Sequence, residues 1–397
     1  MKIALICCPF KTSYGAYADS LRAELEKLGG NTVQWVGSNC GCGDPIETSR
    51  AFQTKDCSYF DMPILVDFRS KTPWKRKARG AARSVILYAR AKRYAELSAG
   101  ADVVHFQQIL NAYGSKAVFP WLKRPSDAAR VITVHELDPD QQERPETNLT
   151  YNLADAVLVH CEDLRQQLTK LGVQPEKVHV MLYGTNVPPP APDALRDGIV
   201  FYGGHKLMTG KGIDTFFQAM AMVKERLGAR MPRLKIHGHF GPVTPEGGKE
   251  LAAANGLTEI TDWLNQIDDQ KIFTLYQHSL VCVLPFTGSF AGLPAAMAGI
   301  CGLPMVCTRK AGLPDHLGES GIYIDEKNPQ QLADRALELL TDQARWQRAS
   351  DGILQRAQEN LTWEVIARKT YNIYQQAIAN RKKKHQSVEE EAMALSR

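Results

Sequence analysis

The sequence predicts an α/β protein made of two doubly wound domains. Short runs of β-branched and apolar residues alternate with helix-like stretches, a pattern typical of βαβ units and parallel sheets. The alternation stops at a proline-rich stretch over residues 185–198 and then starts again. A chain of 397 residues also favours two domains of roughly 150–200 residues each. We therefore predict an N-terminal domain over 1–184, a linker over 185–198 and a C-terminal domain over 199–361.

The N-terminal domain opens with the strand KIALICC at residues 2–8, followed by a loop and a helix. Short β-branched runs then predict further buried strands. These runs lie at 32–37, 102–107, 131–137, 156–161 and 178–184. Residues 38–70 are rich in Cys, Asp, Pro and Ser, and we predict an irregular insertion or long loop there.

The alternation repeats in the C-terminal domain, after a linker that successive prolines make stiff and extended. Strands are predicted at 198–204, 233–241, 281–286, 304–308 and 321–325. Helices are predicted at 212–228, 268–278, 329–341, 343–358 and 362–382. The tail after residue 382 segregates basic from acidic residues, and we expect it to fray.

The composition, with 44% apolar and 23% charged residues, indicates a soluble globular protein. No stretch approaches the roughly 18–20 apolar residues of a membrane span, and the start MKIALICCPF is typical of a buried strand. We expect a cytoplasmic protein, with peripheral attachment to the inner face of a membrane as an open alternative. Most of the nine cysteines fall in apolar strands and are interpreted as buried thiols. Cys40, Cys42 and Cys57 lack the spacing of a metal site, so no metal is predicted.

A basic segment lies between residues 71 and 93. It holds nine Lys and Arg residues without any Asp or Glu, and apolar residues interleave. A basic amphipathic helix of this kind suits an anionic membrane surface, a phosphorylated acceptor or nucleic acid. A solvated helix face that only maintains solubility is an equally weighted alternative. Of the functional interpretations, we favour contact with a membrane or acceptor and expect no nucleic-acid partner. The residues chosen for this role are Lys75, Arg76, Lys77 and Arg79.

Two residues of the N-terminal domain follow predicted strands and are candidates for ligand binding, because the carboxyl ends of such strands border the ligand crevice. Gly15 is expected in the first strand–helix turn, where glycine lets backbone N–H groups approach a ligand closely. An ordinary turn glycine is the alternative. His135 ends the strand at 131–137 beside Glu136, where it can form hydrogen bonds or transfer a proton. A structural histidine is the alternative there.

The loop FYGGHKLMTGKGID at residues 201–214 is the candidate phosphate site of the C-terminal domain. Its candidate residues are two of its four glycines and three basic residues, namely Gly203, Gly204, His205, Lys206 and Lys211. Two lysines over a helix N-terminus can neutralise a diphosphate leaving group, a role that a metal would otherwise play. The loop is not a Walker sequence, because GKG lacks the required spacing and hydroxyl group. A purely structural loop is the alternative.

The colinear order of these segments resembles the retaining glycosyltransferases of family 4, which have the GT-B fold. The series runs DVVHFQ, VITVHEL, ADAVLVHCEDLRQQLTKLGV, KVHVMLYGTNV, FYGGHKL–KGID, RLKIHGHFG, AGLP and CGLPMV. The chain ends with ENLTWEVIARKTYNIYQQAI, which is similar to the family's terminal helix that crosses back onto the N-terminal lobe. The resemblance implies two Rossmann-like domains facing each other across a cleft, with the acceptor on the N-terminal side and a nucleotide-sugar donor on the C-terminal side.

The resemblance also implies roles for the candidate residues. Lys206 and Lys211 match the family's basic pair on the donor phosphates, with Lys in place of the usual Arg, and His205 fits a variant spacing. Lysine keeps the charge but loses the guanidinium fork. Gly15 matches the glycine of the family's first loop, and His135 matches the cleft histidine near the transferred sugar.

The segment 281–308 departs from the family, which usually carries two glutamates eight residues apart around Gly-Leu-Pro. One glutamate contacts the donor sugar and the other contacts the ribose hydroxyls. Anchoring on Gly292 and Leu293 puts Ser289 and Met297 at these positions. Ser289 can still exchange a hydrogen bond. Met297 cannot pair with a ribose diol, and leaving those hydroxyls unpaired costs about 1–3 kcal/mol.

The leading hypothesis, which rests on the resemblance, is a glycosyltransferase acting on a UDP- or GDP-linked sugar donor. The sugar would pass with retention to a glycan or lipid-linked acceptor in surface polysaccharide or glycolipid synthesis. No cofactor is expected beyond the nucleotide-sugar co-substrate. The missing glutamates favour one alternative, a catalytically degenerate GT-B protein that binds or scaffolds an active transferase. Another GT-B enzyme, such as a sugar epimerase or a phosphorylase, has no positive support.

Overall fold

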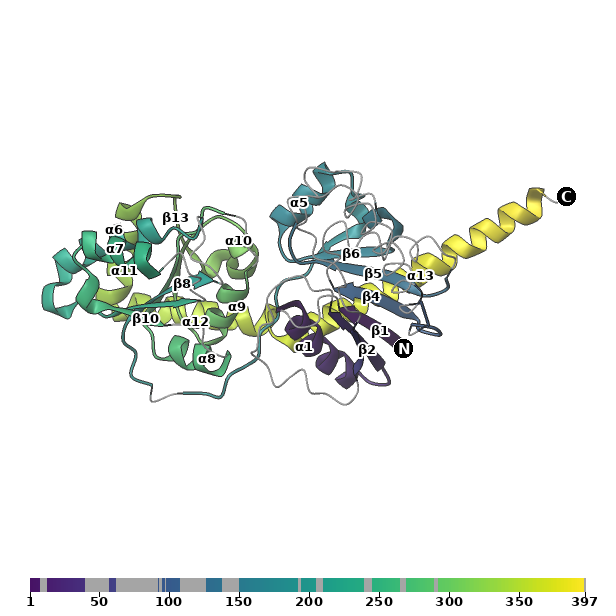
Figure 1. Cartoon of the computed structure of the whole chain (residues 1–397), viewed down its shortest axis with the longest axis horizontal. Coiled ribbons are helices and arrows are strands. Elements are labelled where there is room, and N and C mark those ends of the chain that lie inside the picture. Colours follow the sequence, from purple (N-terminus) through teal and green to yellow (C-terminus); the bar gives the residue numbers. More distant parts are fainter. Residues whose placement is uncertain are drawn as a thin grey trace, which may run out of the picture. The chain divides into compact units, whose positions relative to one another are not determined.

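The computed structural model, drawn in Figure 1, describes residues 1–7, 13–39, 57–61, 92, 95–96, 98–107, 126–137, 150–191, 194–204, 210–238, 245–264, 269–288 and 292–395. The chain forms two compact units. Unit 1 comprises Met1–Met181 and Ile366–Arg397, and unit 2 comprises Leu182–Val365.

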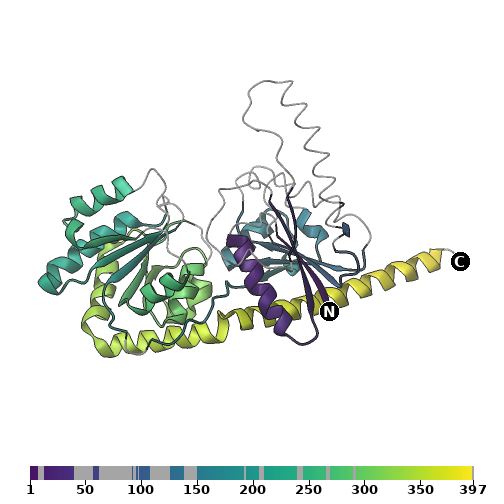
Figure 2. The ribbon, with the colours of Figure 1, turned by 60° about the horizontal axis from the view of Figure 1, so that its bottom comes forward.

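Unit 1 is built on a parallel sheet, drawn in purple to blue in Figure 2, and its strand order is β3-β2-β1-β4-β5-β6-β7. The strands are β1 (Lys2–Cys7), β2 (Thr32–Asn39), β3 (Cys57–Asp61), β4 (Val103–Gln107), β5 (Ala129–Val134), β6 (Ala156–Val159) and β7 (Val178–Val180). Helix α1 (Ser13–Lys27) follows β1, and helix α5 (Glu162–Lys170) follows β6. Because the order runs outward from β1 in both directions, the sheet is doubly wound.

Unit 2 repeats this plan in a parallel sheet with the order β10-β9-β8-β11-β12-β13. The strands are β8 (Ile199–Gly204), β9 (Leu234–Gly238), β10 (Thr261–Leu264), β11 (Val281–Leu284), β12 (Met305–Thr308) and β13 (Ile322–Ile324). The α-helices are α6 (Ile213–Leu227), α7 (Pro245–Ala254), α8 (Asp269–Gln277), α9 (Leu293–Ile300), α10 (Leu313–Leu317), α11 (Pro329–Thr341) and α12 (Gln343–Asn360). The predicted α/β class with two doubly wound sheets is confirmed.

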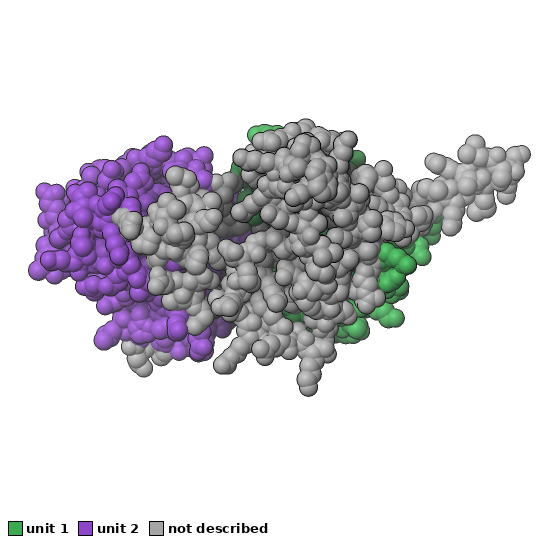
Figure 3. All heavy atoms as spheres, in the orientation of Figure 1, with its two compact units in different colours: residues 1–181, 366–397 green, residues 182–365 purple. Residues whose placement is uncertain are grey.

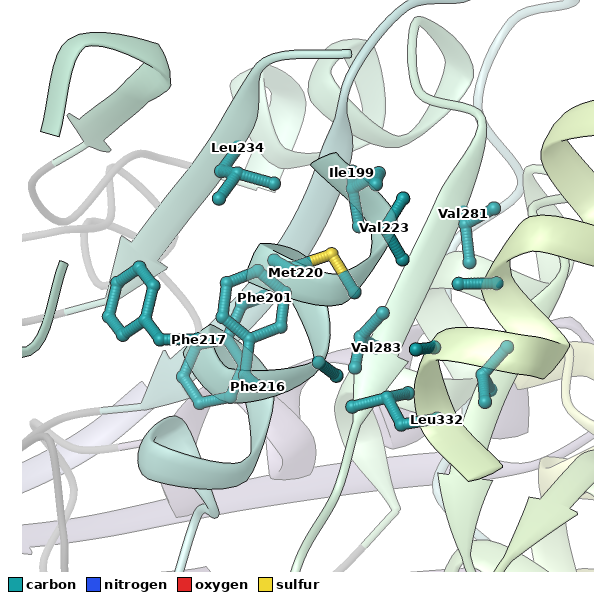
Figure 4. Close-up of a cluster of buried hydrophobic side chains, with 14 of the residues drawn as sticks. Ile199, Phe201, Phe216, Phe217, Met220, Val223, Leu234, Val281, Val283 and Leu332 are labelled. Carbon is teal, nitrogen blue, oxygen red and sulfur yellow. The ribbon is translucent and has the colours of Figure 1, made fainter. Parts of the chain in front are cut away.

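The strands of unit 2 bury side chains on both faces of the sheet. In β8, Ile199 and Phe201 belong to one hydrophobic cluster, whereas Val200 belongs to the other. Figure 4 shows the first cluster, in which α6 contributes Phe216 and α11 contributes Leu332. Since successive side chains of a strand point to opposite faces, a continuous apolar run is the pattern of a strand covered on both sides.

Two elements differ from the prediction. Residues 57–61, expected within an irregular insertion, form β3 and pair in parallel with β2. The run CSYFD carries no apolar alternation, and backbone pairing to the neighbouring strand determines its structure. Helix α13 (Trp363–Leu395) continues past the expected end at residue 382. Residues 381–395 contain no Gly or Pro and are rich in strong helix formers, so the tail does not fray at its start.

The stretch 185–198, predicted as a linker, belongs to unit 2, which is drawn in purple in Figure 3. Its backbone is tied to that unit at several points. Thr185 forms a β-bridge with Thr362, and the side-chain amide of Gln277 donates to the carbonyl oxygen of Pro189 at 2.7 Å. The Arg196 guanidinium donates to three backbone carbonyl groups, those of Tyr276, Ser279 and Cys301.

Helix α13 begins in unit 2, and from Ile366 onward it belongs to unit 1. Arg381 holds it there through an ion pair with Asp155, in which the Nη1–Oδ2 distance is 2.9 Å. The hydroxyl of Tyr374 lies 2.6 Å from Nδ1 of the buried His105. The last helix therefore supplies polar partners to the interior of unit 1.

Candidate functional site

The loops that follow β8 and β11 meet at the carboxyl end of the unit 2 sheet. These two strands are neighbours, although β9 and β10 separate them in the sequence and lie on one side of β8. Open α/β sheets bind ligands at such a switch point. The backbone N–H groups of Thr287 and Gly288 both donate to the carbonyl oxygen of Gly210, at 2.8 and 3.1 Å. These bonds join the two loops.

Gly212 allows the first of these loops to turn into helix α6. Its φ is 72°, in the left-handed region, and a Cβ atom there would overlap the carbonyl oxygen of Pro285. Both observations require glycine. The helix begins at the next residue, so its first backbone N–H groups lie at the switch point, where they favour an anion.

Lys211 is the residue of the predicted phosphate pair that the structure describes. Only 4% of its surface is exposed. Its Nζ atom lies 4.1 Å from the ring centroid of Phe286 and 5.3 Å from that of Tyr202, within the range of a cation–π interaction. Burial lowers the pKa of Lys211 to about 7. An anionic ligand would favour the charged form again, so this side chain can take up a proton when a diphosphate binds.

Gly203 and Gly204 lie at the end of β8, as the strand predicted over 198–204 implied. The strand extends to Gly204 and shifts its register against β9 between Tyr202 and Gly204. Such a β-bulge at the rim of a sheet changes the direction of the chain that leaves it. The other predicted residues of this loop, His205 and Lys206, lie outside the described residues.

Gly292 and Leu293 form the entry to α9, with Gly292 as its cap. A Cβ atom on Gly292 would overlap the ring of His316. The Nδ1 atom of His316 donates to the Gly312 carbonyl at 2.7 Å, and its Nε2 accepts from the backbone N–H of Tyr183 at 3.0 Å. Burial lowers the pKa of His316 to about 4, as expected of a neutral ring that donates once and accepts once.

Met297 lies on α9 inside the second hydrophobic cluster of unit 2 and is 7% exposed. It packs there as an apolar side chain, and its thioether is only a weak hydrogen-bond acceptor. The other position where the family has a glutamate, Ser289, lies outside the described residues.

Sequence reasoning missed the Gly-Leu-Pro run at Gly312 to Pro314, in which Gly312 caps α10 and Leu313 begins it. Ala311, directly before it, has a φ of 56°, a conformation that is uncommon for a residue with a Cβ atom. The detectable signal was the tetrapeptide Ala-Gly-Leu-Pro, which occurs at 291–294 and again at 311–314.

His135 lies directly after β5 at the carboxyl end of the unit 1 sheet and is 4% exposed. Its Nε2 is 3.0 Å from Oε1 of Gln107, and its Nδ1 is 2.9 Å from Nε2 of His160. The ring of Tyr17 packs edge-on against it, with centroids 4.8 Å apart. Burial, His160 and His105 all lower the pKa of His135 well below 6.5. Both ring nitrogens thus already have partners within the protein.

These hydrogen bonds continue in both directions through the interior of unit 1. On one side, Nδ1 of His160 donates to the carbonyl oxygen of Met181 at 2.8 Å. On the other side, the Gln107 amide lies 3.2 Å from Nε2 of His105, and His105 meets Tyr374 of α13 at 2.6 Å. Burial lowers the pKa of His105 to about 3. We name the five side chains the histidine chain: Tyr374, His105, Gln107, His135 and His160.

Only His135 of this chain was predicted. The available signal was two polar residues, His105 and Gln107, at alternate positions of an otherwise apolar strand. Side chains two residues apart share one face of a strand, so they were candidates for one buried network.

Gly15 lies in the first turn of α1, whereas the sequence suggested the loop before the helix. The helix starts at Ser13, a residue type favoured at helix starts. The glycine is buried, close to the free backbone N–H groups that every helix N-terminus carries.

The basic residues Lys75, Arg76, Lys77 and Arg79 lie outside the described residues. Within the described ranges, no group of three or more His, Cys, Asp or Glu side chains is placed to hold a metal ion. None of the helices in the part of the chain that the structure describes combines the length and apolar character needed to cross a membrane.

Two family patterns match most of the chain. The pattern described as "Glycosyl transferase 4-like domain" matches residues 14–184, and "Glycosyl transferases group 1" matches residues 196–342. The chain belongs to the family-4 glycosyltransferases. The resemblance inferred from the sequence is thereby confirmed for both halves of this glycosyltransferase.

Curated relatives are similar in sequence to part of this glycosyltransferase. A D-inositol 3-phosphate glycosyltransferase of Corynebacterium diphtheriae is 29% identical over 175 residues, which are 43% of this chain and 40% of the relative. An MMP alpha-(1->4)-mannosyltransferase of Mycolicibacterium hassiacum is 25% identical over 217 residues, 53% of this chain and 51% of the relative. The chain thus spans about half the length of the curated relatives it matches.

Solved structures cover nearly the whole glycosyltransferase. A glycosyltransferase from Rickettsia africae superposes with a TM-score of 0.71 at 17% identity, covering 96% of this chain and 99% of that one. The sucrose-phosphate synthase of Thermosynechococcus elongatus gives 0.70 at 20% identity, covering 96% and 100%. An Anabaena protein in complex with UDP and glucose gives 0.66 at 13% identity, covering 93% and 98%. At these identities the likeness shows the fold, which is GT-B.

Proposed function

We propose that this glycosyltransferase moves a sugar, with retention, from a nucleotide diphosphate-sugar to a hydroxyl group of a glycan or lipid-linked acceptor. The product would belong to a surface polysaccharide or a glycolipid. The observation that carries the proposal is the setting of Lys211, a buried lysine at the start of α6 where two loops are joined at the switch point of unit 2. An ammonium group beside a helix N-terminus favours a polyanion such as a diphosphate.

In the proposed reaction, the bond between the anomeric carbon and the donor's phosphate oxygen breaks, and the nucleotide diphosphate leaves with the electron pair. Lys211, together with Lys206, stabilises the charge that develops on this leaving group. The acceptor hydroxyl attacks the same face of the sugar, and its proton passes to the departing phosphate oxygen. No protein base is needed, which agrees with the engaged ring nitrogens of His135. Gly15 and His135 help to position the sugar and the acceptor.

The relatives support a UDP- or GDP-linked donor. Their names refer to glycosyl and mannosyl transfer, and two of the similar structures were solved with UDP. Gly203, Gly204 and His205 would then lie along the nucleotide, and Ser289 near the donor sugar. In place of a carboxylate on the ribose this chain has Met297, so phosphate contacts must supply most of the donor affinity.

The test is isothermal titration calorimetry with UDP, GDP and a panel of their sugars, followed by assays of donor hydrolysis and transfer. We expect at least one nucleotide to bind, and Lys211→Ala to reduce turnover by a factor corresponding to about 2–4 kcal/mol. Lys249→Ala, which removes an exposed lysine of α7, is the matched control and should leave turnover unchanged. Absence of binding to every nucleotide and sugar would refute the donor site.

The second candidate function is a binding partner of an active transferase. The burial of Met297 in a hydrophobic cluster favours it, because no carboxylate from that position reaches a ribose. The same panel separates the two functions, since a scaffold that has lost the donor site neither binds nor hydrolyses any donor.

The basic segment is proposed to hold the enzyme at an anionic membrane surface near a lipid-linked acceptor. Replacing Lys75, Arg76, Lys77 and Arg79 together by Gln should weaken binding to vesicles that contain anionic lipid, because each basic residue near such a surface contributes about 1 kcal/mol. Unchanged partitioning of the quadruple variant would remove the membrane assignment.

A further inference from the structure

The hydrogen-bond partners of the histidine chain in unit 1 restrict which ring nitrogens carry hydrogen. A neutral imidazole carries one N–H donor and one acceptor nitrogen. The carbonyl oxygen of Met181 only accepts, so Nδ1 of His160 carries a hydrogen. One further hydrogen must lie between His160 Nε2 and His135 Nδ1, which are 2.9 Å apart.

The proton count of the two rings then depends on which atom the Gln107 amide turns toward His135. With Oε1 at the 3.0 Å contact, Nε2 of His135 must donate, and the two rings together hold three hydrogens and one positive charge. With the amide turned over, its N–H donates to His135, and the two rings hold two hydrogens and no charge. An amide exchanges these two positions by a half-turn about its terminal bond.

His105 has closer partners on both ring nitrogens. Its Nε2 lies 2.7 Å from Oγ1 of Thr133, compared with 3.2 Å from the Gln107 amide, and its Nδ1 lies 2.6 Å from the Tyr374 hydroxyl. Because a hydroxyl group can donate or accept, the half-turn does not determine the tautomer of His105. In the neutral arrangement the donors from Gln107 through His135 to His160 point the same way, which strengthens each hydrogen bond through its neighbours.

Burial decides between the two arrangements. His105, Gln107 and His160 are fully buried and His135 is nearly so, and an ionised group in such surroundings is costly. The groups known to face His135 include His105 of β4, His160 after β6 and Tyr17 of α1. The two neighbouring imidazoles, like burial, act against a charged His135.

We propose that Gln107 and His160 are positioning residues that hold His135 as the neutral Nδ1–H tautomer, with both ring nitrogens hydrogen-bonded within the protein. His135 then neither takes up nor releases a proton during the reaction. Gln107 is the decisive residue, because its amide group can donate to Nε2 of His135. The step from tautomer to turnover rests on the proposed transferase function, whereas the tautomer itself does not.

The test is nitrogen-15 NMR of the full-length protein labelled in histidine, since imidazole nitrogens with and without hydrogen have well-separated shifts. At pH 7 we expect the Nδ1–H form for His135 and for His160. An Nε2–H or doubly protonated His135 overturns the assignment. This spectrum needs no variant and no activity.

Gln107→Glu tests the causal role of the amide, because a carboxylate can only accept. We expect His135 to donate from Nε2 and the His135–His160 pair to gain one proton. Gln34→Glu, at an exposed position of β2, is the matched control and should leave all three rings unchanged. With an active donor–acceptor pair, kcat should fall about 10–100-fold while the donor KM changes little. A changed tautomer with unchanged kcat would refute the positioning role.

Discussion

Replacing Lys211 by Met should make unit 2 more stable in mild acid and flatten the pH dependence of its stability. Met keeps an unbranched apolar side chain as far as the Cε position of the lysine but lacks the terminal amine. The pKa of Lys211 is about 7 in the folded protein and 10.5 for the free side chain. At about 1.4 kcal/mol for each tenfold change in proton affinity, protonating the buried amine costs up to about 5 kcal/mol.

The sign follows from proton binding. Below pH 7 the amine is protonated in the folded and the unfolded chain, and the whole cost is present. Between pH 7 and 10.5 the unfolded chain binds the proton and the folded chain does not, so the free energy of unfolding rises with pH. Hydrogen exchange of α6 peptides in urea at pH 6 and pH 9 measures this for unit 2. We expect Lys211→Met to gain about 2–5 kcal/mol at pH 6 relative to wild type and much less at pH 9.

The matched control is Lys249→Met, because that lysine is exposed on α7. It should retain the wild-type pH dependence. If Lys211→Met shows the same rise in unfolding free energy between pH 6 and pH 9 as wild type, the Lys211 amine does not cause the pH dependence. Burial would then not lower the pKa of this amine as described.

Three further predictions concern unit 2. UDP binding at pH 8 should take up close to one proton, because a diphosphate raises the lowered pKa of Lys211; calorimetry in buffers of different ionisation enthalpy measures the uptake, and zero uptake contradicts it. Gly212→Ala should destabilise unit 2 by about 1–3 kcal/mol in urea unfolding, since it adds a Cβ at a positive φ against Pro285. Gly292→Ala should cost a similar amount by displacing the His316 ring. Gly247→Ala, where nothing lies within 4 Å of an added Cβ, is the control for both glycines, and equal melting of all three variants would refute the contacts described.

The sequence was sufficient to predict those strands whose apolar pattern agrees with their burial in the structure. The apolar runs of β8 and β11 predicted strands covered on both faces, and the two clusters of unit 2 confirm this, with Ile199 on one face and Val200 on the other.

What the sequence could not supply depends on partners distant in the chain. β3 has no apolar alternation and exists through pairing with β2. The tautomer of His135 depends on Gln107 and His160, which lie 28 and 25 residues away. Lys211 looked like one of several basic loop residues, and the burial that lowers its pKa comes from the packing of segments that are distant in the chain, with Phe286 after β11 among its contacts.

The return of α13 to unit 1 has a consequence for how the protein is made. Unit 1 begins the chain, but Tyr374 and Arg381, which meet His105 and Asp155 in its interior, come after the whole of unit 2. A ribosome therefore releases every residue of unit 2 before unit 1 has its last polar partners. During synthesis unit 2 can reach its final packing first, while Asp155 beside the seven-stranded sheet still lacks its ion pair with Arg381. Separate expression of unit 1 likewise requires that residues 366–395 be joined to it or supplied as a peptide.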